Sequence, residues 1–139
     1  MTDDILKLIK YRFSQAEETL TVAKEMLSNR HYRDAVNRAY YAMFYCGLGL
    51  LASKKLGSSK HSGVLSLFSQ HFVKTGMFPA EAGGHFRKAF EIRQRGDYRE
   101  FVEIKKEEAE ETIRNAEKFV DEAHRVLDKM QRAEEKGQN

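Results

Sequence analysis

The chain of 139 residues has little proline, a single cysteine and no tryptophan. It contains one proline and nine glycines, and these two residue types form most tight turns. A sandwich or barrel of short strands needs a turn roughly every ten residues. The shortage of turn residues therefore argues against such folds, and we expect long helices.

The single cysteine excludes an internal disulfide and a cysteine-rich zinc site. Cys46 lies in an apolar stretch. A chain without disulfides is typical of a reducing compartment. The chain begins with Asp3 and Asp4 where a secretory signal would carry basic residues. We therefore expect a cytoplasmic protein.

Long hydrophobic runs are also missing. The longest run without a charged residue is 39–53, fifteen residues with tyrosines in its middle. A helix that crosses a bilayer needs about 20 apolar residues. The run therefore predicts a buried core helix and no contact with a membrane.

Charge is distributed unevenly along the chain. The net charge is +3, but residues 1–79 carry 11 Lys and Arg against 6 Asp and Glu, and the remainder is slightly acidic. A basic surface over the first half would suit phosphate groups. Solvated surface lysines explain the same counts, so both interpretations stay open.

Five segments show the apolar spacing of amphipathic helices, with apolar residues three and four positions apart. The predicted helices span about 3–27, 30–55, 60–74 and 85–95, and the last runs from between 98 and 104 to 130. Ser59 is the expected cap of the third helix, and Gly96 is expected to end the fourth. Residues 77–84, which include Pro79, are expected to be irregular.

The second helix is apolar on almost every side after Tyr40, which indicates a central position. Gly47 and Gly49 weaken it by about 1 kcal/mol each relative to alanine, a cost usually tolerated where another helix approaches closely. The sequence thus predicts an all-α fold, an antiparallel up-and-down bundle of four main helices plus one short helix. We expect one domain over residues 1–132 and a frayed tail over 133–139. Two copies are expected to join through the tyrosines of the second helix or the apolar seam of the last.

Common catalytic motifs are absent from the sequence. It contains no GxxxxGK[ST], GxGxxG, HExxH or GxSxG pattern. Asp121 and His124 form one acid-x-x-His pair, but a di-iron bundle needs two such pairs and further glutamates. We expect no metal and no cofactor.

Arg93 is the most unusual residue in the pattern. It follows Phe86, Ala89 and Phe90 on the apolar side of the fourth helix, where an arginine is rarely left unpaired. One interpretation is a structural pair with Asp97, four residues later. The other is an anion site that meets a phosphate, with Arg95 and Arg99 nearby in sequence.

His61 also has two interpretations. It lies on the apolar side of the third helix, four residues before Leu65 and next to Lys60. It is either a half-buried structural histidine or part of a polar site.

Three strings of the sequence resemble the small archaeal and bacterial branch of the HEPN domain proteins. The strings are NRAYYAMFYC from Asn37, KHSGVLSLFSQHF from Lys60 and FEIRQRGDYREF from Phe90. The resemblance implies a dimeric bundle of four or five helices, often encoded beside a minimal nucleotidyltransferase and acting with it as a toxin and antitoxin pair. Many members are metal-independent endoribonucleases that use an arginine, a polar residue after it, and a histidine four to six positions beyond.

The resemblance carries over only in part. The motif arginine matches Arg93 and the polar residue Gln94, but the histidine position holds Tyr98, Arg99 or Glu100. Asp97 and Tyr98 follow the pattern of this branch instead. RNA cleavage needs a group that exchanges protons near neutral pH, so His61 from another helix is our candidate to replace the missing histidine. In the presence of a nucleotidyltransferase, the Tyr98 hydroxyl would be a target for modification.

Three hypotheses follow for function. The first is a toxin–antitoxin component with a degenerate ribonuclease motif that binds a nucleotide or RNA phosphate, a nucleotidyltransferase partner, or both. The second is a metal-independent endoribonuclease with a base outside the motif, and the third is a non-catalytic helical assembly protein. The candidate catalytic residues are Arg93, Asp97, Tyr98 and His61, and the candidate anion-binding residues are Arg93, Arg95, Arg99 and Lys60.

Overall fold

The computed structural model describes the backbone of residues 1–98 and 102–137 and their side chains, except those of Asp97 and Tyr98. Within this part of the chain every regular element is helical. The elements are α1 (Asp3–Ser28), α2 (Tyr32–Ser53), α3 (His61–Phe68), the π-helix η1 (Ser69–Val73), α4 (Ala80–Tyr98) and α5 (Lys106–Gly137).

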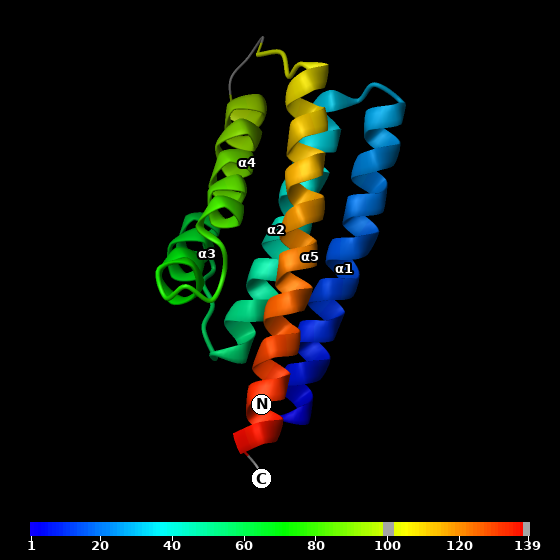
Figure 1. The fold of residues 1–139 in the computed structure, drawn as a ribbon. Coiled ribbons are helices and arrows are strands. Elements are labelled where there is room, and N and C mark those ends of the chain that lie inside the picture. The colour runs from blue at the N-terminus through cyan, green and yellow to red at the C-terminus, as the bar shows by residue number, and fades with distance from the viewer. Residues whose placement is uncertain (99–101, 138–139) are drawn as a thin grey trace.

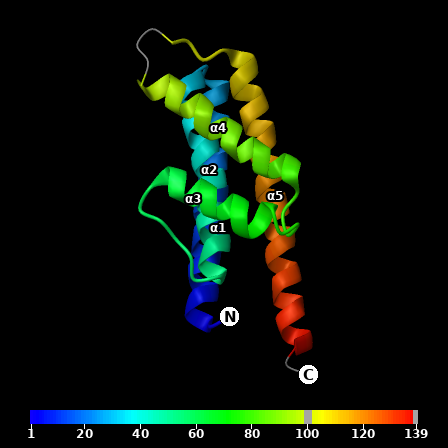
Figure 2. The ribbon, with the colours of Figure 1, turned by 90° about the vertical axis from the view of Figure 1, so that its left-hand side faces the viewer.

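The long helices run up and down in turn (Figure 1). The chain passes up α1, down α2, up α4 and down α5, and α3 with η1 lies beside the lower half of α4. Figure 2 shows α3 and α4 crossing one face of the layer formed by the other helices. The two termini lie at the same end, where the amino group of Met1 is 2.6 Å from a carboxylate oxygen of Glu134. The predicted fold class is therefore confirmed.

The second helix is central, as its apolar composition predicts. α2 packs against α1, α3, α4 and α5, and Tyr40, Met43 and Leu50 are fully buried. Gly47 and Gly49 mark the two close crossings. A Cβ at Gly47 would lie 3.2 Å from the Phe86 ring of α4, and one at Gly49 would lie 3.1 Å from the Phe13 ring of α1.

Both ends of α2 differ slightly from the prediction for a backbone reason. Arg30 and Lys55 adopt left-handed φ values of 64° and 58°, which no right-handed helix can contain. The helix therefore begins at Tyr32 instead of Arg30 and ends at Ser53 instead of Lys55.

The third predicted helix is divided. α3 ends at Phe68 and continues as one π-helical turn, in which the Lys74 amide donates to the carbonyl of Ser69 at 2.8 Å. The predicted cap was wrong: Lys60 is at the cap position and makes no side-chain cap bond. The Ser58 hydroxyl instead accepts a hydrogen bond from the Lys60 amide.

The fourth helix is longer than predicted at both ends. It begins at Ala80, directly after Pro79, and it passes through Gly96 to Tyr98. Most of the segment expected to be irregular thus belongs to helix. Gly96 is buried against the Ile104 side chain, so this glycine permits close packing and does not end the helix.

The last helix begins at Lys106, two residues after the predicted limit, and extends beyond Met130 to Gly137. Residues 132–137 are exposed, in agreement with the loss of apolar spacing there. The boundary between a domain over 1–132 and a frayed tail stays a prediction.

Candidate functional site

A pocket lies between the start of α3 and the second half of α4. Its volume is about 370 Å³, and it is lined by Lys60, His61, Ser62, Phe90, Arg93 and Gln94. Three of the residues proposed from the sequence, Lys60, His61 and Arg93, therefore share one pocket although up to 33 positions separate them in the chain.

Arg93 is half-buried and held against α2. Its Nε donates to Oδ1 of Asn37 at 3.3 Å, and its Nη2 donates to the hydroxyl of Tyr41 at 3.4 Å. Asn37 and Tyr41 are four residues apart, so they lie on the same side of α2. The guanidinium carbon also lies 5.3 and 5.2 Å from the ring centres of Tyr40 and Tyr41, within the range of cation–π attraction. These contacts fix the guanidinium at the pocket wall.

His61 is the first residue of α3 and packs among the aromatic rings of α2. Its ring is stacked on Phe44 with centres 4.4 Å apart, and its Nδ1 is 3.0 Å from the hydroxyl oxygen of Tyr40. Burial, and then the positive charge of Arg93, lower the pKa of His61 below its ordinary value of 6.5. His61 is therefore neutral at pH 7.

Tyr40 lies beneath the pocket and joins its two principal residues. It is fully buried, its hydroxyl meets His61, and its ring faces Arg93. Burial raises the pKa of Tyr40, an effect that the Arg93 charge only partly opposes. The phenol thus keeps its proton.

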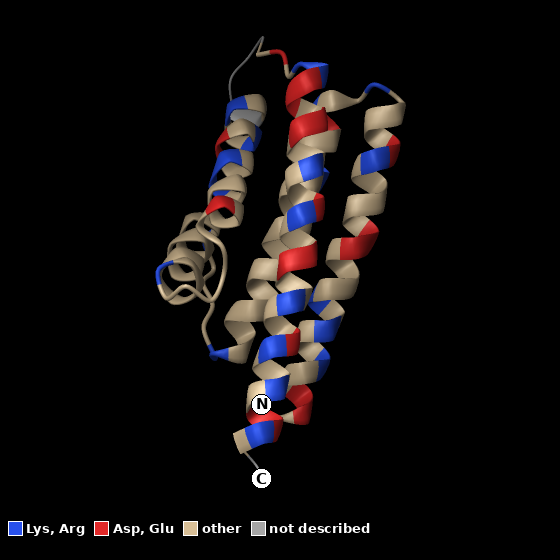
Figure 3. Cartoon of the chain, viewed as in Figure 1, with Lys and Arg blue, Asp and Glu red and all other residues tan. Residues whose placement is uncertain are grey.

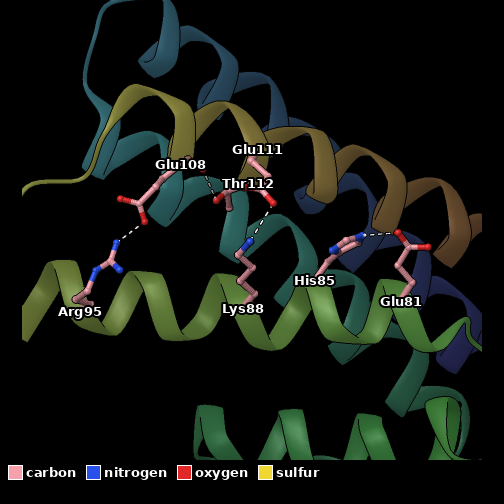
Figure 4. A network of polar contacts seen from close by, with 7 residues as sticks. All are labelled: Glu81, His85, Lys88, Arg95, Glu108, Glu111 and Thr112. Atoms are coloured by element: carbon pink, nitrogen blue, oxygen red, sulfur yellow. Dashed lines mark hydrogen bonds and ion pairs between the residues drawn. The ribbon is translucent and has the colours of Figure 1, made fainter.

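Arg95 lies apart from the pocket. It forms an ion pair with Glu108 of α5 (Figure 4). Lys88 and Glu111, 2.9 Å apart, make a second tie between α4 and α5; the hydrogen bond from Lys88 lowers the pKa of Glu111. The structure does not bring Arg95 together with Arg93, and its role here is to connect two helices.

The other proposed residues lie outside the described part of the site. The backbone of Asp97 and Tyr98 completes α4, but their side chains are outside the described residues, as is the whole of Arg99. The expected pair of Arg93 with Asp97 and the roles of Tyr98 and Arg99 thus stay predictions.

Sequence reasoning missed Asn37, Tyr40 and Tyr41 as site residues. All three belong to the NRAYYAMFYC string, whose tyrosines we assigned to a core helix and to a candidate association surface. The available signal was the spacing of Asn37 and Tyr41, which are four positions apart and so lie on one side of the helix. The contacts of Asn37 and Tyr41 with Arg93 of α4 join residues more than 50 positions apart, and the apolar spacing within one helix does not predict them.

Comparison with known proteins gives the family. The family model described as the HEPN domain matches residues 9–127. The chain belongs to the HEPN family. It is 44% identical over 127 residues to a "UPF0332 protein" of Thermotoga maritima, a match that covers 91% of this chain and 96% of that protein.

Two relatives from Methanocaldococcus jannaschii carry names that refer to toxicity. "Putative toxin MJ0605" is 39% identical over 91% of this HEPN chain and 94% of its own length. "Putative toxin MJ0142" is 35% identical over 88% of each chain.

Two features of the described residues concern the membrane and metal expectations. None of the helices in this region is long and apolar enough to cross a membrane. Over the same residues, no group of three or more His, Cys, Asp or Glu side chains has an arrangement that could hold a metal ion.

Proposed function

We propose that this HEPN protein is a toxin-type component that binds the phosphate of an RNA or a nucleotide in the pocket between α3 and α4. The observation that carries the proposal is the shared pocket of Lys60, His61 and Arg93. Each of these side chains can donate hydrogen bonds through nitrogen, and an arginine beside a lysine is a common arrangement for binding phosphate. The names of the two archaeal relatives support the toxin-type role.

The contacts of Arg93 with α2 prepare this side chain for binding. Asn37 and Tyr41 accept its hydrogen bonds and orient the guanidinium at the pocket wall. An oriented guanidinium at a pocket wall loses little conformational entropy when an anion binds.

A binding measurement tests this proposal. Fluorescence anisotropy of a short labelled single-stranded RNA is recorded with the wild type, with Arg93→Ala and with Arg114→Ala. Arg114 is an exposed arginine of α5 outside the pocket, so its loss removes the same net charge. We expect Arg93→Ala to weaken binding by roughly 10-fold or more and Arg114→Ala to change it little. Equal effects of the two variants would show that the pocket is not the binding site, and no binding by any of the three proteins would favour the helical assembly protein.

A second candidate function, a metal-independent endoribonuclease, is favoured by the position of His61. This histidine and Arg93 line the same pocket, although the family motif position has no histidine. For cleavage, the imidazole nitrogen that faces the pocket would have to be unprotonated, so that it can take the proton of a 2′-hydroxyl. RNA cleavage that survives a chelator and disappears in His61→Ala would establish this activity.

We also propose a homodimer and a protein partner. The seam of α5 is buried within its own bundle, including Ala116, Val120 and Ala123, so it is not the surface that joins two copies. The tyrosine surface of α2 is the remaining candidate, because Tyr41, Tyr45 and Leu48 are only partly buried. A minimal nucleotidyltransferase is the partner that the family resemblance implies, and co-purification from a strain that expresses both proteins tests it.

A further inference from the structure

The hydrogen bond between Tyr40 and His61 decides which nitrogen of the histidine carries the proton. The two atoms, Oη and Nδ1, are 3.0 Å apart. Nδ1 is the one hydrogen-bond partner that the described part of the chain offers to the Tyr40 hydroxyl. Each partner can donate or accept in principle, because a neutral imidazole has one nitrogen of each kind.

Burial of Tyr40 removes this ambiguity. The side chain is fully buried, so water cannot accept the hydroxyl proton, and a buried donor without an acceptor is costly. Arg93, whose guanidinium carbon lies 5.3 Å from the centre of the Tyr40 ring, has donors only. If Nδ1 donated to Tyr40, the hydroxyl proton would have no acceptor. Tyr40 therefore donates to Nδ1, and the proton of the neutral imidazole lies on Nε2.

The other groups around His61 agree with this assignment. It packs against the rings of Tyr40, Tyr41 and Phe44 of α2, and Arg93 of α4 and the preceding Lys60 share its pocket. No carboxylate is among these residues, so nothing in this group favours an imidazolium. The pKa of His61 is lowered and the pKa of Tyr40 is raised, so both shifts favour the uncharged form of the side chain.

We infer that Tyr40 is a positioning residue that holds neutral His61 as the Nε2–H tautomer, so that His61 donates a hydrogen bond to a phosphate oxygen in the pocket. The ligand part of this inference rests on the proposed function, but the tautomer does not. With Nδ1 occupied by Tyr40, Nε2 is the ring nitrogen left for a ligand. In this tautomer Nε2 has no lone pair to take the proton of a 2′-hydroxyl, so the pocket is suited to binding and not to general-base cleavage.

Nitrogen-15 NMR of the imidazole rings in the wild-type protein without ligand tests the tautomer directly. The chain has five histidines, and the signals missing from His61→Gln assign this one. Above the pKa, we expect Nε2 to show the shift of a protonated nitrogen and Nδ1 that of an unprotonated one. The reverse assignment would overturn the inference, and this measurement needs no variant of Tyr40.

The pKa of His61 in the variant Tyr40→Phe separates a hydrogen-bond donor from a residue that only fills space. A donor at Nδ1 stabilises only the neutral imidazole, because the charged ring has no lone pair there. Its removal is therefore expected to raise the pKa of His61. A pKa that falls or stays constant in a folded Tyr40→Phe protein would mean that Tyr40 is not the donor.

Binding of the short single-stranded RNA then tests the donor role. A glutamine amide can place an N–H near the position of Nε2, whereas alanine cannot. We expect His61→Ala to weaken binding roughly 10-fold and His61→Gln to weaken it less. Equal losses in both variants would contradict the donor role. If the tautomer is as inferred but the wild type binds no RNA, the proposed function fails and the tautomer assignment stands.

Discussion

Arg93 shows how a single charged residue acquires a defined position on an apolar helix side. Its apolar neighbours on α4 turn this side toward α2, and there Asn37 and Tyr41 accept its hydrogen bonds. The tyrosine rings add cation–π attraction, worth roughly 0.5–2 kcal/mol depending on exposure. The guanidinium therefore stays oriented while one side of it lines the pocket.

At this scale the sequence predicted the residue but not its environment. The apolar stripe identified Arg93, and the position beside Lys60 singled out His61. Tyr40 and Tyr41 were missed because tyrosines in an apolar helix usually fill the core, which Tyr40 also does. Asn37 was missed because its partner, Arg93, lies on another helix. Which tyrosine hydroxyl meets which charged group depends on how α2, α3 and α4 pack, and helical spacing along one chain does not contain that information.

The lowered pKa of His61 predicts a pH dependence of folding. The unfolded chain titrates near 6.5, and the folded chain at a lower pH. As the pH falls through this window, the unfolded state takes up the proton first, so the free energy of unfolding decreases. It recovers fully above the unfolded pKa.

Urea unfolding at about pH 7.5 and about pH 5.5 measures this effect. We expect the wild type to lose more stability at the lower pH than His61→Gln, which has no titrating group at this position. A wild type that loses the same amount as the variant, or less, would contradict the direction of the shift. The other four histidines are common to both proteins and cancel in the comparison.

At the scale of the element, glycines mark the places where one helix packs closely against another, and several of them lie inside a helix and do not end it. Gly47 and Gly49 were correctly predicted as crossing points, because both lie within a long apolar run. Gly83, Gly84 and Gly96 were interpreted as signs of irregular chain or a helix end, although all three lie inside α4. In the sequence, a glycine that ends a helix cannot be told from a glycine at a close helix contact. Only the element that packs against it distinguishes the two cases. The π-helical turn and the left-handed Arg30 and Lys55 have no spacing signal either.

Two adjacent glycines of α4 give a matched pair of substitutions. A Cβ at Gly83 would lie 2.5 Å from Cγ2 of Val73, whereas one at Gly84 would have nothing within 4 Å. Alanine improves helix propensity by about 1 kcal/mol at either position, but overpacking costs about 1–3 kcal/mol. We expect Gly83→Ala to lower the free energy of unfolding by about 1 kcal/mol and Gly84→Ala to raise it by about 0.5–1 kcal/mol.

Chemical denaturation of the two variants measures these changes. The double variant Val73→Ala with Gly83→Ala removes the clashing methyl groups, so the substitution at Gly83 should no longer destabilise in that background. A Gly83→Ala protein as stable as Gly84→Ala would show that α4 and η1 are farther apart than the structure places them.

At the scale of the whole molecule, the two candidate association surfaces, the seam of α5 and the tyrosine surface of α2, differ in how far they are buried. α5 uses its seam to close the core, while α2 keeps a side with Tyr41, Tyr45 and Leu48 only partly buried. Positions of basic and acidic residues recur along α1 and α5, as the blue and red segments of Figure 3 show. The helix count and the central position of α2 were predictable from apolar spacing, and the up-and-down order was predictable from the short connections between helices. The pocket was not, because it lies between helices.

The α2 surface gives a prediction for the assembly. We expect a homodimer in solution, and we expect Tyr45→Glu to dissociate it, since a carboxylate in an apolar interface must lose its hydration. Light scattering distinguishes a dimer from the 16.1 kDa monomer. Thr21→Glu makes the same charge change at an exposed position of α1 in the groove toward α5 and serves as the control. A Tyr45→Glu protein that remains dimeric would exclude this surface, and a monomeric wild type would exclude the dimer.

The salt dependence of RNA binding tests the central claim most directly. Each phosphate that meets a protein cation releases counterions, so the logarithm of the affinity for single-stranded RNA falls with the logarithm of salt by about 0.7 per contact. We expect the wild type to show such a slope and Arg93→Ala to show one that is shallower by about 0.7, with Arg114→Ala close to the wild type. Identical slopes for the wild type and Arg93→Ala would show that this guanidinium meets no phosphate and would contradict the account.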